Sequence, residues 1–278
     1  MMTTSSLSVA PASATPVRKV TPRGVLRSEW AKFWSLRSSW ITLTASVVVL
    51  LVFGTIAAST YSPPTGADSG PSMSDGSSDA VNLALMGTPF VSLIVGSLGV
   101  LLFAGEYSTG MIRSTLAAVP RRLPVLFSKI AVVAPLVLVL TTIGAFVAFQ
   151  LGAIGLDGEE IALSLGDDGV LRSLLGVGVY LALVAVFGVA LGALLRSAAG
   201  GIASLLGILL ILPNLTSLLP DSLADTLQPY FPSTAGEAMF SLHRSADSLS
   251  PGAGFAVFAA WVALALAAAA IRLKRTDA

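Results

Sequence analysis

The residue types that usually carry enzyme chemistry are almost missing from this sequence. Its 278 residues include no cysteine and a single histidine, His243, so thiolate nucleophiles, disulfides, iron–sulfur clusters and cysteine zinc sites are excluded together. The sequence contains neither the His-Glu-x-x-His motif of a catalytic zinc site nor the Gly-x-x-x-x-Gly-Lys-[Ser/Thr] loop that binds nucleotide phosphates. We therefore expect no catalytic site, no metal site and no cofactor in this chain.

The polar segment with the most informative pattern is 106–122, which follows a long apolar stretch. We expect a helix to end close to Glu106, and the helix macrodipole disfavours an anion at that end by about 0.3–1 kcal/mol. An unfavourable placement indicates either a compensating basic partner or a function. The candidate basic partners are Arg113, Arg121 and Arg122.

The residues after Glu106 predict a short helix with one apolar side. Gly110 permits a sharp change of direction because glycine tolerates a positive φ, and residues 111–118 can then form about two helical turns. Pro120 ends them, because the residue before a proline is pushed out of the helical region. Two neighbouring rows form the apolar side: Met111, Thr115 and Ala118 in one, Ile112 and Leu116 in the other. Such a side fits a groove of a partner protein; the alternative is an ordinary loop whose arginines only enforce topology.

The elements that position this segment are expected to be membrane helices. The chain is 54% hydrophobic and 11% charged, with a mean hydropathy of +0.85, whereas soluble domains carry about 25% charged residues. Each of six segments free of Asp, Glu, Lys and Arg is long enough for the ~20 residues that cross a bilayer core: 38–67, 80–105, 130–156, 173–195, 197–220 and 248–271. They do not alternate as barrel strands do. The sequence therefore predicts an all-α integral membrane protein with six transmembrane helices.

The basic residues predict the orientation. All but Arg172 and Arg244 of the 16 basic residues lie on one side of the predicted spans, whereas all but Glu29, Glu106 and Asp277 of the 15 acids lie on the other. Positive charge marks the cytoplasmic side. We therefore expect a multi-pass protein of the plasma membrane with both termini in the cytoplasm.

The chain outside the spans is divided as follows. Residues 1–20 lack the apolar core of a signal peptide and predict a disordered cytoplasmic tail. Residues 21–38 predict an amphipathic helix in the inner membrane interface, in contact with lipid; the alternative is a simple stop before the first span. The residues assigned to that helix are Leu26, Arg27, Glu29, Trp30, Lys32, Phe33 and Trp34. Residues 39–271 form the six-helix domain and 272–278 a cytoplasmic tail.

Ion-coupled transport is disfavoured by the predicted spans themselves. Secondary transporters and channels usually keep ionisable residues in their spans for protons, ions or voltage, and the centres of all six predicted spans have none. A transporter of this kind would need another polypeptide as its motor. The alternatives are a membrane assembly or regulatory protein that transports nothing and, less favoured, a secondary transporter.

Three segments resemble ABC-2-type transporter permeases, particularly actinobacterial ones. They are the loop 105–122, the N-terminal segment 27–40 and the turn 190–202. Together with the six-span topology, the resemblance covers the chain from about residue 22. It implies the membrane half of an ATP-driven exporter, in which two permease subunits, identical or different, pair and each binds a separate ATP-binding cassette subunit.

The resemblance also implies how energy reaches the membrane helices. ATP and Mg²⁺ would be bound by the two copies of the ATP-binding subunit, whose closure the cytoplasmic helices of the permease would transmit. The residues expected to couple the chain to that subunit are Glu106, Tyr107, Gly110, Met111, Ile112, Arg113, Thr115, Leu116, Pro120, Arg121 and Arg122. The uncharged spans favour a hydrophobic or amphipathic cargo. A net charge of +1 gives no field that would steer a nucleic acid to the chain.

Overall fold

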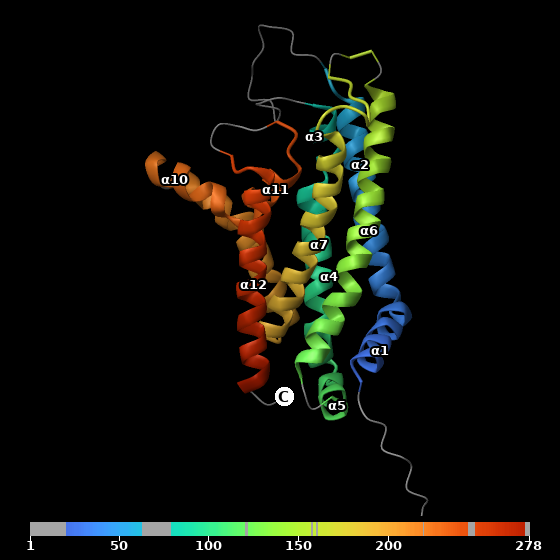
Figure 1. Ribbon diagram of the computed structural model, residues 1–278, viewed down its shortest axis with the longest axis vertical. Coiled ribbons are helices and arrows are strands. Elements are labelled where there is room, and N and C mark those ends of the chain that lie inside the picture. Colours follow the sequence, from blue (N-terminus) through green and yellow to red (C-terminus); the bar gives the residue numbers. More distant parts are fainter. Residues whose placement is uncertain are drawn as a thin grey trace, which may run out of the picture.

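The computed structural model describes residues 21–62, 79–119, 122–156, 158–159, 161–218, 220–243 and 248–275. Within these ranges every regular element is a helix, which confirms the predicted fold class (Figure 1). The predicted tail 1–20 lies outside the described residues, as do Pro120 and Arg121.

In the described part of the chain, five helices are long and apolar enough to cross a membrane. They are α2 (Arg37–Ser59), α4 (Thr88–Ser108), α6 (Leu123–Gly155), α7 (Val170–Leu195) and α12 (Pro251–Arg275). All five run along the long axis of the molecule, side by side (Figure 1). An elongated bundle of helices with apolar surfaces satisfies its backbone groups internally, as a membrane interior requires.

The fifth expected span, 197–220, is shorter than the others. Its helical part runs from Ala198 to Asn214 as α8 (Ala198–Leu206), a π-helical turn (Gly207–Ile211) and α9 (Leu212–Asn214), and a 3₁₀ turn (Leu215–Leu218) follows. Pro213 has no N–H to donate to the carbonyl four residues earlier. The preceding turn widens instead, and the Leu212 N–H bonds to the Gly207 carbonyl. The proline therefore explains why the regular helix is lost here.

Short helices fill the connections between the spans. The charge-free segment 80–105 is divided into α3 (Ala80–Ala84) and α4 by a turn at 85–87. Between the fifth and sixth expected spans lie α10 (Asp221–Leu227), a 3₁₀ turn (Gln228–Tyr230) and α11 (Pro232–Phe240). α11 packs on α7 and α12, whereas α10 projects sideways from the bundle (Figure 1).

α7 is the central helix of the bundle. Of its most apolar 18 residues, 78% are buried, against 22% for α12. α7 and α4 approach closely through small residues: a Cβ atom on Gly188 would overlap the Gly96 carbonyl, and one on Gly192 would lie 2.5 Å from the Val100 carbonyl oxygen. The pair Gly188 and Gly192 is therefore a helix-packing motif, as its small-xxx-small spacing predicts.

The two ends of the bundle differ. α1 (Pro22–Ser35), α5 (Met111–Ala118) and the C-terminal end of α12 lie at one end, and α3 lies at the other (Figure 1). We refer to these as the α5 end and the α3 end. At the α5 end, α12 continues to Arg275, so residues 272–275 of the predicted tail are helical. Residues 276–278 lie outside the described part of the chain.

Candidate functional site

The turn between α4 and α5 has the predicted geometry. α4 ends at Ser108, Gly110 has φ +73°, and α5 runs from Met111 to Ala118. A Cβ atom on Gly110 would meet nothing within 4 Å. The backbone conformation, rather than crowding, therefore requires glycine at this position.

α1 places one polar and two apolar side chains against the bundle. It begins where Thr21 accepts the Gly24 N–H at 3.2 Å, with Pro22 at its first position, which suits the fixed φ of proline. Val25, Glu29 and Phe33, spaced four residues apart, are its buried residues. Four-residue spacing puts them on one side of the helix, toward α6.

Two of the residues assigned to the interfacial helix, Glu29 and Phe33, are buried and do not lie on the exposed side of α1. Leu26, Trp30 and Trp34 are exposed, whereas Phe33, expected among them, is 2% exposed and belongs to the core. Trp30 stacks on Trp34 with ring centroids 5.7 Å apart, and Trp34 contacts Trp40 edge-on at 4.5 Å. Exposed tryptophans at the end of a membrane bundle are typical of the membrane–water interface.

Glu29, Lys32, Glu106 and Lys129 form one ion cluster at the α5 end. Lys129 Nζ lies 2.7 Å from Glu29 Oε2 and 2.6 Å from Glu106 Oε1. Lys32 Nζ lies 2.8 Å from Glu29 Oε1 and 3.1 Å from Glu106 Oε1. Two carboxylates and two ammonium groups balance, so the ion cluster carries no net charge.

The ion cluster is buried and joins four helices. Glu29, Glu106 and Lys129 are 4%, 7% and 5% exposed, and they come from α1, α4 and α6. Lys32 also donates to Thr115 Oγ1 of α5 at 3.3 Å. Charges this deep in a protein are tolerated only when they are paired, so the four helices are held together by groups that cannot separate without a large cost.

The partners of Glu106 correct the prediction. Its ion pairs among the described residues are with Lys32 and Lys129, two lysines that were not among the expected partners, whereas the expected Arg121 lies outside the described residues. Arg113 is exposed on α5, and Arg122 Nη1 donates to the Leu273 carbonyl of α12 at 3.0 Å. The physical reason is that Glu106 faces the interior, toward α1 and α6, whereas Arg113 and Arg122 come after the change of chain direction at Gly110.

Lys129 is the site residue that sequence reasoning missed. In the sequence it is one of the basic residues whose predicted role is only to mark the cytoplasmic side. The signal was present: Lys129 stands in the apolar run of α6, between buried Ser128 and half-buried Ile130. A lysine inside an apolar helix is costly without a partner, so it should have been paired with a nearby acid.

Lys32 is the most accessible member of the ion cluster, with 30% of its side chain exposed. Partial burial would by itself lower its pKa, but the hydrogen bond and charge of Glu29 and the charge of Glu106 outweigh that effect and raise the pKa. Lys32 therefore keeps its positive charge throughout the physiological pH range.

The structure also corrects the prediction of which side of α5 could dock on a partner protein. Ile112 is 3% exposed and Leu116 packs against the core of the chain itself, so neither can form part of a docking surface for another protein. The buried side of α5 faces the bundle because α5 folds back after Gly110. The exposed residues of α5, which we call the α5 surface, are Met111, Arg113, Ser114, Ala117 and Ala118.

Tyr107 connects α4 to the turn between α7 and α8. The guanidinium carbon of Arg196 lies 5.2 Å from the centroid of the Tyr107 ring, within the range of a cation–π interaction. Arg196 itself has φ 57° and caps the C-terminus of α7. The two segments that resemble ABC-2 permeases at this end are therefore in direct contact.

The arrangement of this site can link movements of α5 to the long helices. α5 presents an exposed surface on one side and contacts the ion cluster through Thr115 on the other. A displacement of α5 therefore acts on α1, α4 and α6 through charged groups that must stay paired.

Comparison with known protein families shows what the chain is similar to. A family model described as "ABC-2 family transporter protein" matches residues 25–214. The matched range includes the whole ion cluster and α5, and it ends where α9 ends. No curated protein matches the chain.

Proposed function

The chain belongs to the ABC-2 family of transporter proteins, and from that premise we propose that it is the permease subunit of an ATP-driven exporter in the plasma membrane. Two such permease subunits pair, and each binds an ATP-binding cassette subunit that supplies ATP, Mg²⁺ and the energy of hydrolysis. The cargo is a hydrophobic or amphipathic molecule, because charged groups are costly within apolar spans.

The observation that carries this proposal is the ion cluster beneath α5. A protein that only anchors or assembles others does not need a short surface helix joined by buried charges to three long helices. A permease that is driven by a separate ATPase needs such a link, because the movement of the ATPase has to reach the helices that line the transport path. α5 supplies the contact with the motor, and Lys32, Glu106 and Lys129 pass its displacement to the bundle.

The experiment that tests the proposal uses the full chain with an affinity tag, purified in mild detergent from its own host. An ATPase with phosphate-binding loops should co-purify, and the complex should hydrolyse ATP, whereas the chain freed of that ATPase should not. Hydrolysis that persists in the isolated chain would contradict the proposal. Transport driven by an ion gradient without ATP would favour a secondary transporter, and the absence of any ATPase an assembly role.

We further propose that the α5 end faces the cytoplasm, as the basic residues indicate. Because the chain has no native cysteine, single substitutions report on one position each. Ser164→Cys, in the exposed connection between α6 and α7, should react with an impermeant maleimide added to intact cells. Ser114→Cys, exposed on α5, should not react.

The control for this labelling is permeabilised cells, in which both variants should react fully. Labelling of Ser114→Cys in intact cells, with protection of Ser164→Cys, would reverse the orientation. The expected contrast is between nearly complete and background labelling, which gel-shift with a maleimide–polyethylene glycol reagent measures directly.

A further inference from the structure

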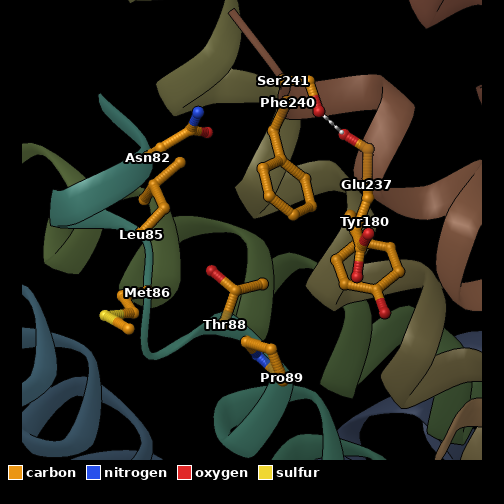
Figure 2. A pocket seen from close by; sticks show the side chains of 9 residues that line it. All are labelled: Asn82, Leu85, Met86, Thr88, Pro89, Tyr180, Glu237, Phe240 and Ser241. Atoms are coloured by element: carbon orange, nitrogen blue, oxygen red, sulfur yellow. Dashed lines mark hydrogen bonds between the residues drawn. The ribbon is translucent and has the colours of Figure 1, made fainter. Parts of the chain in front are cut away.

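A cavity of about 270 Å³ opens at the α3 end of the bundle, far from the ion cluster (Figure 2). It lies between the start of α4, the N-terminal half of α7 and α11. The residues that line it are Asn82, Leu85, Met86, Thr88, Pro89, Tyr180, Glu237, Phe240 and Ser241. Its size is close to the lower limit for small-molecule sites, about 300 Å³.

Glu237 supplies the one ionisable carboxylate of this lining. α11 buries Ala235, Gly236 and Ala238 against the bundle and leaves Glu237 accessible from the cavity. Within the described part of the chain, its carboxylate forms neither an ion pair nor a hydrogen bond. The surrounding protein displaces water from it, and this raises its pKa. A carboxylate in such a place gains from any cation that enters.

Aromatic rings lie beside this carboxylate. The rings of Tyr180 and Phe240 have centroids 5.6 Å apart, and both side chains border the cavity (Figure 2). A Cβ atom on Gly236 would overlap the Tyr180 ring, so the ring lies directly against the backbone of α11 next to Glu237. Phe258 continues the row at 5.5 Å from Tyr180.

Two basic side chains at this end have other partners. Arg172 donates to the backbone carbonyls of Met239 and Ser241, at 3.4 and 2.8 Å. His243 Nδ1 lies 2.9 Å from Asp79 Oδ2. Neither of them pairs with Glu237, so its carboxylate has no basic partner within the described residues.

We propose that this cavity binds a small organic cation, or the cationic group of a larger amphipathic molecule. Glu237 supplies the opposite charge, and Tyr180 and Phe240 supply aromatic surfaces that attract a cation and contact its apolar substituents. A neutral apolar ligand would bury the carboxylate without a partner, and an anion would be repelled. A lone carboxylate is also too few oxygen ligands for a calcium ion, which takes about 6–8.

The place of this cavity in transport rests on the proposed function. With the α5 end in the cytoplasm, the cavity lies at the exit side of the bundle, where an exported cation would pause before release. The binding of a cation, however, does not depend on ATP or on a partner, and it is tested separately.

The test uses the purified full chain in phosphatidylcholine nanodiscs, whose lipid carries no net charge. Binding of radiolabelled benzyltrimethylammonium is measured by equilibrium dialysis without nucleotide. The wild-type chain should bind the probe saturably, and Glu237→Gln should weaken binding at least tenfold. Asp168→Asn removes an exposed charge at the same end and should change the affinity less than twofold.

Three results would overturn the inference: no saturable binding to the wild-type chain, equal affinity in Glu237→Gln, or an equal loss in Asp168→Asn. The last would mean that general negative charge attracts the probe. Saturable binding that depends on Glu237, in a chain with which no ATPase co-purifies, would instead reject the proposed function and leave the cation site in place.

Discussion

Lys129→Met should cost about 3–5 kcal/mol of stability and abolish ATP-dependent transport, because removing one member of a buried ion cluster leaves the others uncompensated. Methionine keeps the length and apolar character of the lysine chain but not its charge. Glu29 and Glu106, both buried, would then share Lys32 alone. The expected readout is a lower melting temperature of the purified chain, measured by fluorescence-detected gel filtration after heating.

Two further variants separate charge balance from general damage. Lys274→Met removes an exposed lysine at the same end and should change stability by no more than about 0.5 kcal/mol. Adding Glu106→Gln to Lys129→Met leaves one acid and one base, so the double variant should recover part of the lost stability. A Lys129→Met chain as stable as Lys274→Met would show that the ion cluster does not hold these helices together.

Met111→Asp should weaken binding of the ATPase subunit by about 30-fold, as expected for an interface residue worth roughly 2 kcal/mol. Met111 is the largest apolar side chain of the α5 surface and is 46% exposed. It is also the first residue of α5, where the macrodipole favours an anion. The substitution therefore alters the surface while leaving the helix intact, and a pull-down with the tagged chain measures the loss.

The control for this variant is Ala162→Asp, which adds the same charge at an exposed position between α6 and α7. It should leave ATPase binding unchanged. Ile112→Asp would not serve, because Ile112 is buried in the chain itself and an aspartate there would disturb folding. Full ATPase binding by Met111→Asp would remove the α5 surface from the coupling interface.

Features set by neighbouring residues could be predicted from the sequence. The turn at Gly110 and the bounds of α5 follow from a glycine that tolerates a positive φ and from local helix formation, and the structure confirms them. The long spans follow from runs without charge. The shortening of the fifth span could not be predicted from its charge-free run, because a proline near its end acts through the hydrogen bonds of one particular turn.

The ion cluster could not be predicted because its members are distant in the sequence. Lys32 and Glu106 are 74 residues apart, and Glu29 and Lys129 are 100 apart. Which basic residue pairs with Glu106 depends on how each helix is rotated about its own axis. That rotation is set by the packing of the helices against one another. The same holds for α5: spacing shows an apolar side, but whether it meets the chain itself or another protein depends on where α5 folds back.

The glycine contact between α4 and α7 determines which parts of the molecule can move. At Gly188 and Gly96 the two backbones touch without side chains between them, so sliding one helix along the other would bring side chains into space that fits only hydrogen. The contact therefore opposes sliding of α4 along α7. In the transport cycle that we propose, opening and closing fall to helices joined by adjustable side chains, and α12 is the least buried of the five long helices.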